Sequence, residues 1–327
     1  MKPESAGPEE SGVGLGLQIV PTMSAADVIG IVTAAEDLGY DYCMIADEGL
    51  MHDVYALLAT AAQATSSIRL GAVTNPYTRH PAVTAAAVAS VDELSGGRAF
   101  LTLVAGGSMV LSPLGITRDH PVDRLDEAIS ILSGLWSGET IDFQGNHFRM
   151  SGARLSTAPR DIPLWVAARG PRMLRLAGRR ADAVVLMARS DLGDALAIVN
   201  TAGSPARVYL DRLAYTARMI EESRELYAWA LVDTPARTLA NLGADVALVN
   251  EARDALAAGR PEAIAELIDD EMIAAYQIAG TPHQCTTQLR AVVAEHSLDA
   301  FFVNITGGSC EDNTRILSDV YEMVRDR

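Results

Sequence analysis

Short apolar β-type runs alternate with longer amphipathic helical runs along most of this chain. Such alternation is typical of parallel strands joined by crossover helices, either in an open doubly wound sheet or in a closed barrel. Eight runs have the character of buried strands. They lie at residues 13–20, 42–46, 68–74, 99–104, 163–168, 182–187, 225–232 and 300–305. A count of eight favours an α/β fold of the single (β/α)8 class, the TIM barrel, over a Rossmann sheet.

Two segments interrupt this alternation, and one precedes it. Residues 141–150 (IDFQGNHFRM) have the pattern of a hairpin inserted before the fifth strand. Residues 190–278 are Ala-rich, acidic and mostly helical, and they are longer than one crossover needs, so we expect a divergent helical insertion in the second half. Residues 1–12 are rich in Pro, Gly, Ser and Glu and predict a flexible tail, which leaves 13–327 for the barrel.

Composition narrows the possible partners and the compartment. The 327 residues include 26 Lys and Arg against 42 Asp and Glu, a formal net charge of −16. This charge disfavours nucleic acid and anionic membranes as partners, and no apolar run is long enough to span a bilayer. Cys43, Cys285 and Cys310 are widely spaced and form no disulfide framework, and the N-terminus has no secretory pattern, so we expect the cytoplasm.

In a barrel of this class, reactive groups lie on the loops that follow the strands, at the C-terminal face. Asp47 and Glu48 follow the second predicted strand, and the polar run 74–81 (TNPYTRHP) follows the third. Residues 105–108 (AGGS) follow the fourth strand and 169–172 (RGPR) follow the fifth. We therefore expect these segments to surround a site for a small-molecule substrate.

Missing patterns disfavour several kinds of chemistry. The six histidines contain no HxH or HExxH spacing, so we expect no metal. The chain has no GxSxG nucleophile elbow, and Gly12, Gly14 and Gly16 do not form the GxGxxG motif of a dinucleotide site. No lysine follows a strand end, which disfavours a Schiff-base mechanism.

The segment 169–180 has two features of an anion site. A Gly-Pro pair opens its helix, and the free backbone N–H groups at such a helix start suit a phosphate. Three arginines share one face of this helix, Arg172, Arg175 and Arg179. A solvated basic face without a ligand explains the pattern equally well. The acids after the second strand have a similar alternative, because acids at a helix start are stabilised by the helix dipole.

Four segments carry longer motifs. The most specific is 70–98, which reads LGAVTNPYTRHPAVTAAAVASVDELSGGR. The others are IADEGLMHDVY at 45–55, PLWVAARGPRMLRLAGRRADAVVL at 163–186 and IAGTP at 278–282. These segments resemble the bacterial luciferase-like superfamily of flavin and deazaflavin enzymes, most of all its branch of methylenetetrahydromethanopterin reductases, which use the deazaflavin F420. The resemblance covers residues 14–187 well, the C-terminal quarter of the chain moderately and the middle stretch poorly.

The resemblance implies a (β/α)8 barrel, homodimeric, that binds F420 across its C-terminal mouth, with FMN as the alternative cofactor. In this family a non-prolyl cis peptide at the third strand supports the ring, and here it would fall at Ala72–Val73. The phosphate would lie on the backbone before the 171–180 helix. The implied cofactor-binding residues are Asp47, Ala72, Val73, Thr74, Asn75, Gly106, Gly107, Ala168, Arg169, Gly170 and Arg172.

Two positions depart from the family's pattern. Glu48 occupies the position where the sugar-phosphate dehydrogenase branch has a histidine, and Ser108 follows the fourth strand where many F420 enzymes have an acid. Glu48 can donate a proton if apolar surroundings raise the pKa of its carboxyl. The candidate catalytic residues are therefore Asp47, Glu48 and Ser108.

These observations predict an oxidoreductase that transfers a hydride between reduced F420 and a small organic acceptor, at a C=C or C=N bond. The divergent stretch 190–278 would shape its specificity. An FMN-dependent monooxygenase on the same barrel is the alternative, since FMN has the N5 atom that F420 lacks. A second alternative is a non-catalytic flavin-binding relative, suggested by the missing acid after the fourth strand. A nicotinamide enzyme is a more distant interpretation.

Overall fold

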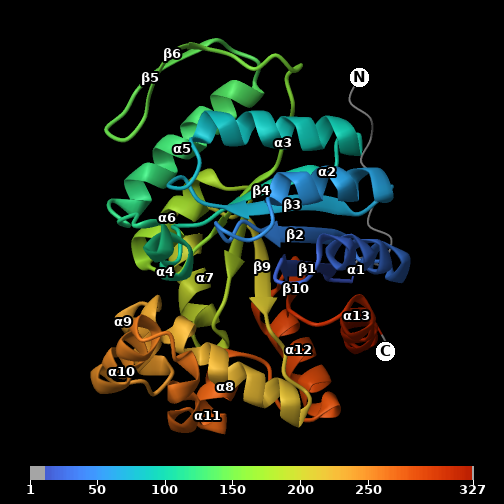
Figure 1. Ribbon diagram of the computed structural model, residues 1–327, viewed down its shortest axis with the longest axis vertical. Coiled ribbons are helices and arrows are strands. Elements are labelled where there is room, and N and C mark those ends of the chain that lie inside the picture. Colours follow the sequence, from blue (N-terminus) through green and yellow to red (C-terminus); the bar gives the residue numbers. More distant parts are fainter. Residues whose placement is uncertain (1–11, 326–327) are drawn as a thin grey trace.

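The computed structural model describes residues 12–325 and shows a closed (β/α)8 barrel, which confirms the predicted fold class (Figure 1). Its strands pair in parallel in the order β1-β2-β3-β4-β7-β8-β9-β10, and β10 pairs with β1. The predicted tail lies outside the described residues except for Gly12. The barrel strands are β1 (Gly14–Val20), β2 (Tyr42–Ala46), β3 (Arg69–Thr74), β4 (Ala99–Leu103), β7 (Leu164–Ala167), β8 (Ala183–Leu186), β9 (Ala206–Asp211) and β10 (Ala300–Thr306).

Helices connect successive strands on the outside of the barrel (Figure 1). They begin and end where the sequence carries caps: the Ser24 hydroxyl accepts the backbone N–H of Asp27, and Gly39 ends the same helix with φ at 88°. The outer helices are α1 (Ala25–Leu38), α2 (Val54–Ala64), α3 (Pro81–Ser95), α5 (Pro121–Trp136), α6 (Pro171–Arg180), α7 (Leu192–Asn200), α12 (Pro282–His296) and α13 (Cys310–Arg325). Shorter pieces are α4 (Ser108–Leu111) and the 3-10 turns η1 (Ser112–Leu114) and η2 (Arg189–Asp191).

Aromatic rings fill the barrel interior. The rings of Phe100 and Trp165 have their centroids 4.4 Å apart, and Phe302 lies 5.8 Å from Trp165. Gly16 and Gly71 make room for them, since an added Cβ would lie 2.4 Å from a ring carbon of Phe302 or Phe100, respectively. The glycines in these two strands are therefore required by close packing.

One predicted strand is wrong. Residues 225–232 form the second half of α8 (Ala217–Val232), and the seventh barrel strand is β9, at Ala206–Asp211. A short apolar run does not distinguish a strand from a buried helix face. Here Tyr227 and Leu231, four residues apart, are both buried on one face of the helix.

The predicted hairpin is present. β5 (Ile141–Gln144) and β6 (Arg149–Ala153) pair antiparallel as a separate two-stranded sheet. The carboxylate of Glu127 on α5 accepts three backbone N–H groups of the turn, residues 146–148, at 2.7 to 3.0 Å. The hairpin turn is thereby fixed to α5.

Between β9 and α12 the chain forms a helical insertion with its own apolar core. The predicted helical character of this region is confirmed apart from β9. Figure 1 shows the insertion as an orange group at the end of the molecule away from the hairpin. It consists of α8, α9 (Ala236–Asn241), α10 (Val246–Ala257), η3 (Pro261–Leu267) and α11 (Asp270–Tyr276).

Among the helices within residues 12–325, none combines the length and the hydropathy that a bilayer crossing requires. Cys43, Cys285 and Cys310 are free thiols, and burial raises the pKa of the Cys285 thiol to about 11.

Candidate active site

A cavity of about 620 Å³ lies at the C-terminal ends of the barrel strands, and the insertion forms its outer wall. The volume is within the range of sites that hold a cofactor or a drug-sized ligand. The residues from the sequence prediction that line it are Asp47, Glu48, Val73, Asn75, Gly106, Gly107, Ala168, Arg169, Gly170 and Arg172. The insertion contributes Trp229, Ala230, Asp233 and Pro235.

Asp47 and Glu48 stand together just after β2. The Asp47 backbone N–H donates to the carbonyl of Val73 at 2.8 Å, and its carboxylate accepts the Thr74 hydroxyl at 2.7 Å. Glu48 is half-buried, and burial, followed by the adjacent charge of Asp47, raises the pKa of the Glu48 carboxyl. Glu48 therefore keeps its proton to a higher pH than a free glutamate does, as a general acid must.

The expectation of a cis peptide at Ala72–Val73 is wrong. Every peptide bond within residues 12–325 is trans. β3 pairs in continuous register with β2 up to Val73 and with β4 up to Thr74, so the strand has no bulge at this point. Side chains alternate along it as in any regular strand. Ala72 packs in the core between the barrel and its outer helices, and Val73 faces the barrel interior.

Asn75 shapes the loop that follows β3. Its side-chain oxygen accepts the backbone N–H groups of Tyr77, at 2.9 Å, and Thr78, at 3.1 Å. Asn75 is 2% exposed and lines the cavity. The amide thus supports the mouth of the barrel through the loop backbone.

Ser108 is hydrogen-bonded to a carboxylate that was not predicted from the sequence. Its hydroxyl donates to Asp233 of the insertion at 2.8 Å, and it is Asp233 that lines the cavity. Arg118 lies 3.2 Å from the other carboxylate oxygen of Asp233 and donates to the carbonyl of Gly106 at 3.0 Å. An acid is therefore present beside the β4 loop, although it comes from a distant part of the chain.

The start of α6 offers backbone N–H groups to the cavity. Gly170 is the N-cap, Pro171 is the first helical residue, and no side chain of the described residues caps this end. A Cβ added at Gly170 would meet nothing within 4 Å, so the space above the backbone is open. Arg172 is 75% exposed and lies 3.6 Å from Asp123 of α5. This end of α6 is suited to an anion.

Arg169 and Arg212 are two further cations at the cavity. Arg169 donates to the Thr234 hydroxyl at 3.0 Å and to the Tyr276 hydroxyl, and its guanidinium carbon lies 5.6 Å from the centre of the Tyr276 ring. Arg212 follows β9 directly. The side chain of Arg169 therefore connects the loop after β7 to the insertion through hydrogen bonds.

Three residues that line the cavity were not predicted from the sequence: Arg212, Trp229 and Asp233. Arg212 could have been found from the run ARVYLD, 206–211, which has the alternation of a strand. Asp233 and Trp229 carry no local signal, because they reach the cavity only when the insertion folds back over the barrel.

The barrel and its cavity define an enzyme of the (β/α)8 class with a site for a small molecule. The chain belongs to the luciferase-like monooxygenase family, whose profile matches residues 5–299. It is 33% identical over 285 residues to the 5,10-methylenetetrahydromethanopterin reductase of Archaeoglobus fulgidus, covering 82% of this chain and 86% of that one. It is 30% identical over 309 residues to the reductase of the same name from Methanolobus tindarius, covering 90% and 93%.

A solved structure has the same fold. The coenzyme F420-dependent tetrahydromethanopterin reductase from Methanopyrus kandleri superposes with a TM-score of 0.83 over 96% of this chain and 99% of that chain, at 23% identity. The chain is thus an enzyme of the luciferase-like family and a relative of 5,10-methylenetetrahydromethanopterin reductases.

Proposed function

We propose that this enzyme transfers a hydride between F420 and a small organic acceptor, at a C=C or C=N bond. The observation that carries the proposal is the layout of the cavity, with the open N-terminus of α6 at one side and the carboxyls of Asp47 and Glu48 at another. The similarity to F420-dependent reductases supports the same assignment.

The residues present fit a deazaflavin. Apolar side chains of Val73, Val104 and Met187 line the cavity and suit a flat ring. The backbone at residues 168–170 and the first N–H groups of α6 suit the phosphate, with Arg172 nearby.

When bound, F420 supplies or accepts a hydride at C5 of its ring. Glu48 holds a proton at its carboxyl and delivers it to the acceptor atom beside the one that is reduced. Asp47, held by the Thr74 hydroxyl, accepts hydrogen bonds from ligands at the same edge. Trp229 and Pro235 of the insertion line the cavity and would limit the access of water to the reacting atoms once a ligand is bound.

An FMN-dependent monooxygenase is the second candidate, and the description of the matching family favours it. Parallel calorimetric titrations with F420 and FMN distinguish the two. We expect F420 to bind at about micromolar or tighter, with FMN at least about tenfold weaker. Preference for FMN would move the assignment to the monooxygenase. Binding of neither would overturn both.

A variant pair locates the phosphate. We expect Arg172→Ala to weaken F420 binding by about 1–3 kcal/mol, the range for a lost hydrogen bond to a charged group. Arg175→Ala is the matched control, because Arg175 is exposed one turn further along α6 and lies outside the cavity. Equal affinities in the two variants would remove Arg172 from the cofactor site.

A further inference from the structure

The cavity has an acidic side and a basic side. Asp47 and Glu48 follow β2, whereas Arg169 follows β7 and Arg212 follows β9. In the circle of eight strands, β8 stands opposite β2, and β7 and β9 are the two neighbours of β8. The two arginines therefore face the two acids across the barrel mouth.

The two arginines differ in their partners. The terminal nitrogens of Arg169 donate to Thr234 and Tyr276, but its Nε is buried and has no hydrogen-bond partner. Within the described chain, the guanidinium of Arg212 has no hydrogen bond or ion pair at all. The charges of Tyr276 and Asp211 attract this guanidinium and that of Arg169 repels it, but none of the three residues forms a hydrogen bond with it.

Asp211, which precedes Arg212 in the sequence, already accepts hydrogen bonds from other groups. The carboxylate of Asp211 accepts the Tyr209 hydroxyl and the backbone N–H groups of Leu213, at 2.7 Å, and Ile278, at 3.0 Å. Burial lowers the pKa of Arg212, yet a guanidinium stays charged at any ordinary pH. A partly buried cation without a partner costs folding free energy, and a ligand anion would recover it.

We infer that Arg212, supported by Arg169, binds a carboxylate or phosphate carried by a ligand in the barrel mouth. The inference rests on the proposed function, since the ligand is either F420 itself or its acceptor. A charged group on the acceptor would be held at the arginines while its reducible bond lies toward Glu48. A charged group on the cofactor would be its phosphate or its glutamate tail.

Calorimetry with four ligands tests the inference and identifies the source of the anion. The ligands are F420, the deazaflavin core Fo (which lacks the phosphate and the tail), succinate and inorganic phosphate. The proteins are the wild type, Arg212→Met, Arg212→Lys, and Arg218→Met as a control. Arg218 is exposed on α8 and pairs with Glu222 outside the cavity, so this control makes the same charge change.

Two results support the inference. A loss of about 10- to 100-fold for F420 but not for Fo in Arg212→Met assigns the anion to the cofactor. Unchanged F420 binding with a similar loss for succinate or phosphate assigns it to the acceptor. Arg212→Lys should recover part of the loss, and thermal unfolding of Arg212→Met should show no decrease in midpoint, since the wild-type cation has no partner to lose.

Unchanged binding of all four ligands in Arg212→Met overturns the inference, as does an equal loss in Arg218→Met. Failure of the proposed function gives a different result, because the wild type would then bind neither F420 nor Fo. The succinate and phosphate titrations of the wild type and Arg212→Met would still test the role of the arginine.

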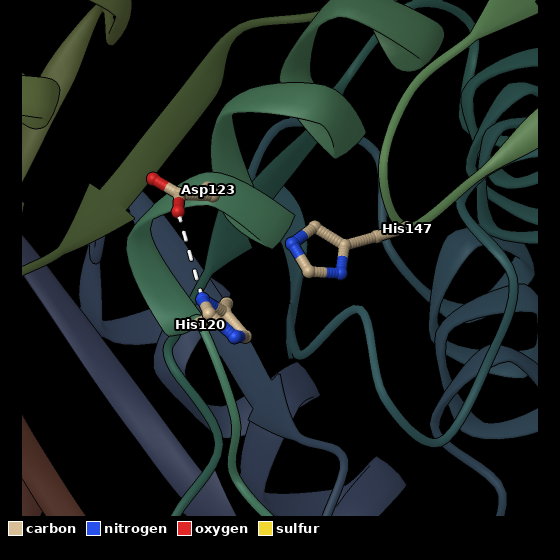
Figure 2. A group of neighbouring side chains, drawn as sticks. All are labelled: His120, Asp123 and His147. Atoms are coloured by element: carbon tan, nitrogen blue, oxygen red, sulfur yellow. Dashed lines mark ion pairs between the residues drawn. The ribbon is translucent and has the colours of Figure 1, made fainter.

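A second inference rests on a separate cluster outside the cavity. Figure 2 shows His120 and Asp123 at the start of α5 and the ring of His147, from the hairpin turn, pointing toward them. Their possible ligand atoms all lie within 4.8 Å of one another, and Nδ1 of His120 is 3.9 Å from the Asp123 carboxylate. The turn that carries His147 is fixed by Glu127.

We propose that these three side chains bind a divalent transition metal, with Zn²⁺ as the best match. Two imidazoles and one carboxylate are a common set of protein ligands for Zn²⁺, and they leave the fourth coordination position to water. Mg²⁺ disfavours imidazole ligands. The metal would join the hairpin to α5. It would also compete with Arg172 for Asp123, and so affect the phosphate side of the cavity.

Calorimetry with Zn²⁺ alone tests this site on the full chain. We expect one equivalent to bind the wild type at about micromolar affinity, and His147→Ala and His120→Ala to lose at least about tenfold. His283→Ala is the control, because His283 is exposed on α12 away from the cluster. Equal affinity in His147→Ala and His283→Ala, or no Zn²⁺ binding to the wild type below millimolar, overturns the proposal.

Discussion

Asp233, the residue after α8, accepts hydrogen bonds from both the backbone N–H of Ser108, at 2.9 Å, and its hydroxyl, at 2.8 Å, across 125 residues of sequence. Arg118 lies 3.2 Å from the same carboxylate. This contact fastens the insertion to the loop after β4. It therefore helps to hold the outer wall of the cavity in place.

Removing the Asp233 carboxylate should loosen that wall. In Asp233→Ala, we expect amide exchange in residues 106–111 and in the end of α8 to quicken, corresponding to about 1–3 kcal/mol less protection, because two hydrogen bonds and one ion pair are lost. Hydrogen-exchange mass spectrometry measures the change. Asp254→Ala, at an exposed site on α10, should leave the same segments unaffected. Equal exchange in the two variants would contradict the assigned contact.

Glu48 should titrate above the ordinary range of a glutamate, since burial and then the charge of Asp47 raise the pKa of its carboxyl. A raised folded-state pKa means that the stabilisation from the protonated form is complete below the unfolded-state pKa and is lost as the pH rises through the folded-state pKa. Infrared difference spectra of wild type minus Glu48→Gln should show a protonated carboxyl above pH of about 4.3, the value of a free glutamate. Glu225→Gln, exposed on α8, is the control for the spectral subtraction. Disappearance of the band at the free-glutamate value would remove Glu48 as the proton donor.

Asp211 gives a second pH dependence, in the stability of the barrel. Burial raises the pKa of its carboxyl to about 6, although hydrogen bonds from Tyr209 and two backbone groups oppose the shift. The contribution of Asp211 to stability is therefore present below pH of about 4 and lost as the pH rises to about 6. Between these limits, the free energy of unfolding of the wild type should fall by about 3 kcal/mol relative to Asp211→Asn. Urea unfolding of both proteins at a series of pH values measures the difference, and parallel curves would show that folding does not raise the pKa of Asp211.

The strands were largely predictable from the sequence because each is a local pattern. β2 has the predicted bounds, and the other correctly placed strands differ from prediction by one residue, at one end or, for β7 and β8, at both ends. The strand at 225–232 failed because its apolar residues repeat as well on a helix face as on a strand. Helix caps are local in the same sense, as at Thr281, whose hydroxyl accepts the N–H of Gln284 three residues further along.

The residues of the candidate site differ in the same way: some follow from a local sequence pattern and others do not. Asp47, Glu48 and Arg172 could be found because they directly follow a strand or open a helix. Asp233 could not, since its place depends on how the insertion packs against the β4 loop. Contacts across more than a hundred residues leave no periodic trace in one sequence.

Two glycines in the barrel strands, Gly16 and Gly71, lie directly against aromatic rings of the barrel interior. At Gly71, an added Cβ would lie 2.4 Å from the ring of Phe100, and both residues are held by strand pairing, so neither can move away cheaply. We expect Gly71→Ala to lower the free energy of unfolding by about 1–3 kcal/mol through overpacking. Phe100→Leu alone should also destabilise, because it leaves space beside Trp165. In the double variant the smaller side chain makes room for the new methyl group, so the combined cost should be less than the sum of the two. Urea unfolding of all four proteins measures this coupling, and strictly additive costs would show that Gly71 is not there to admit the ring.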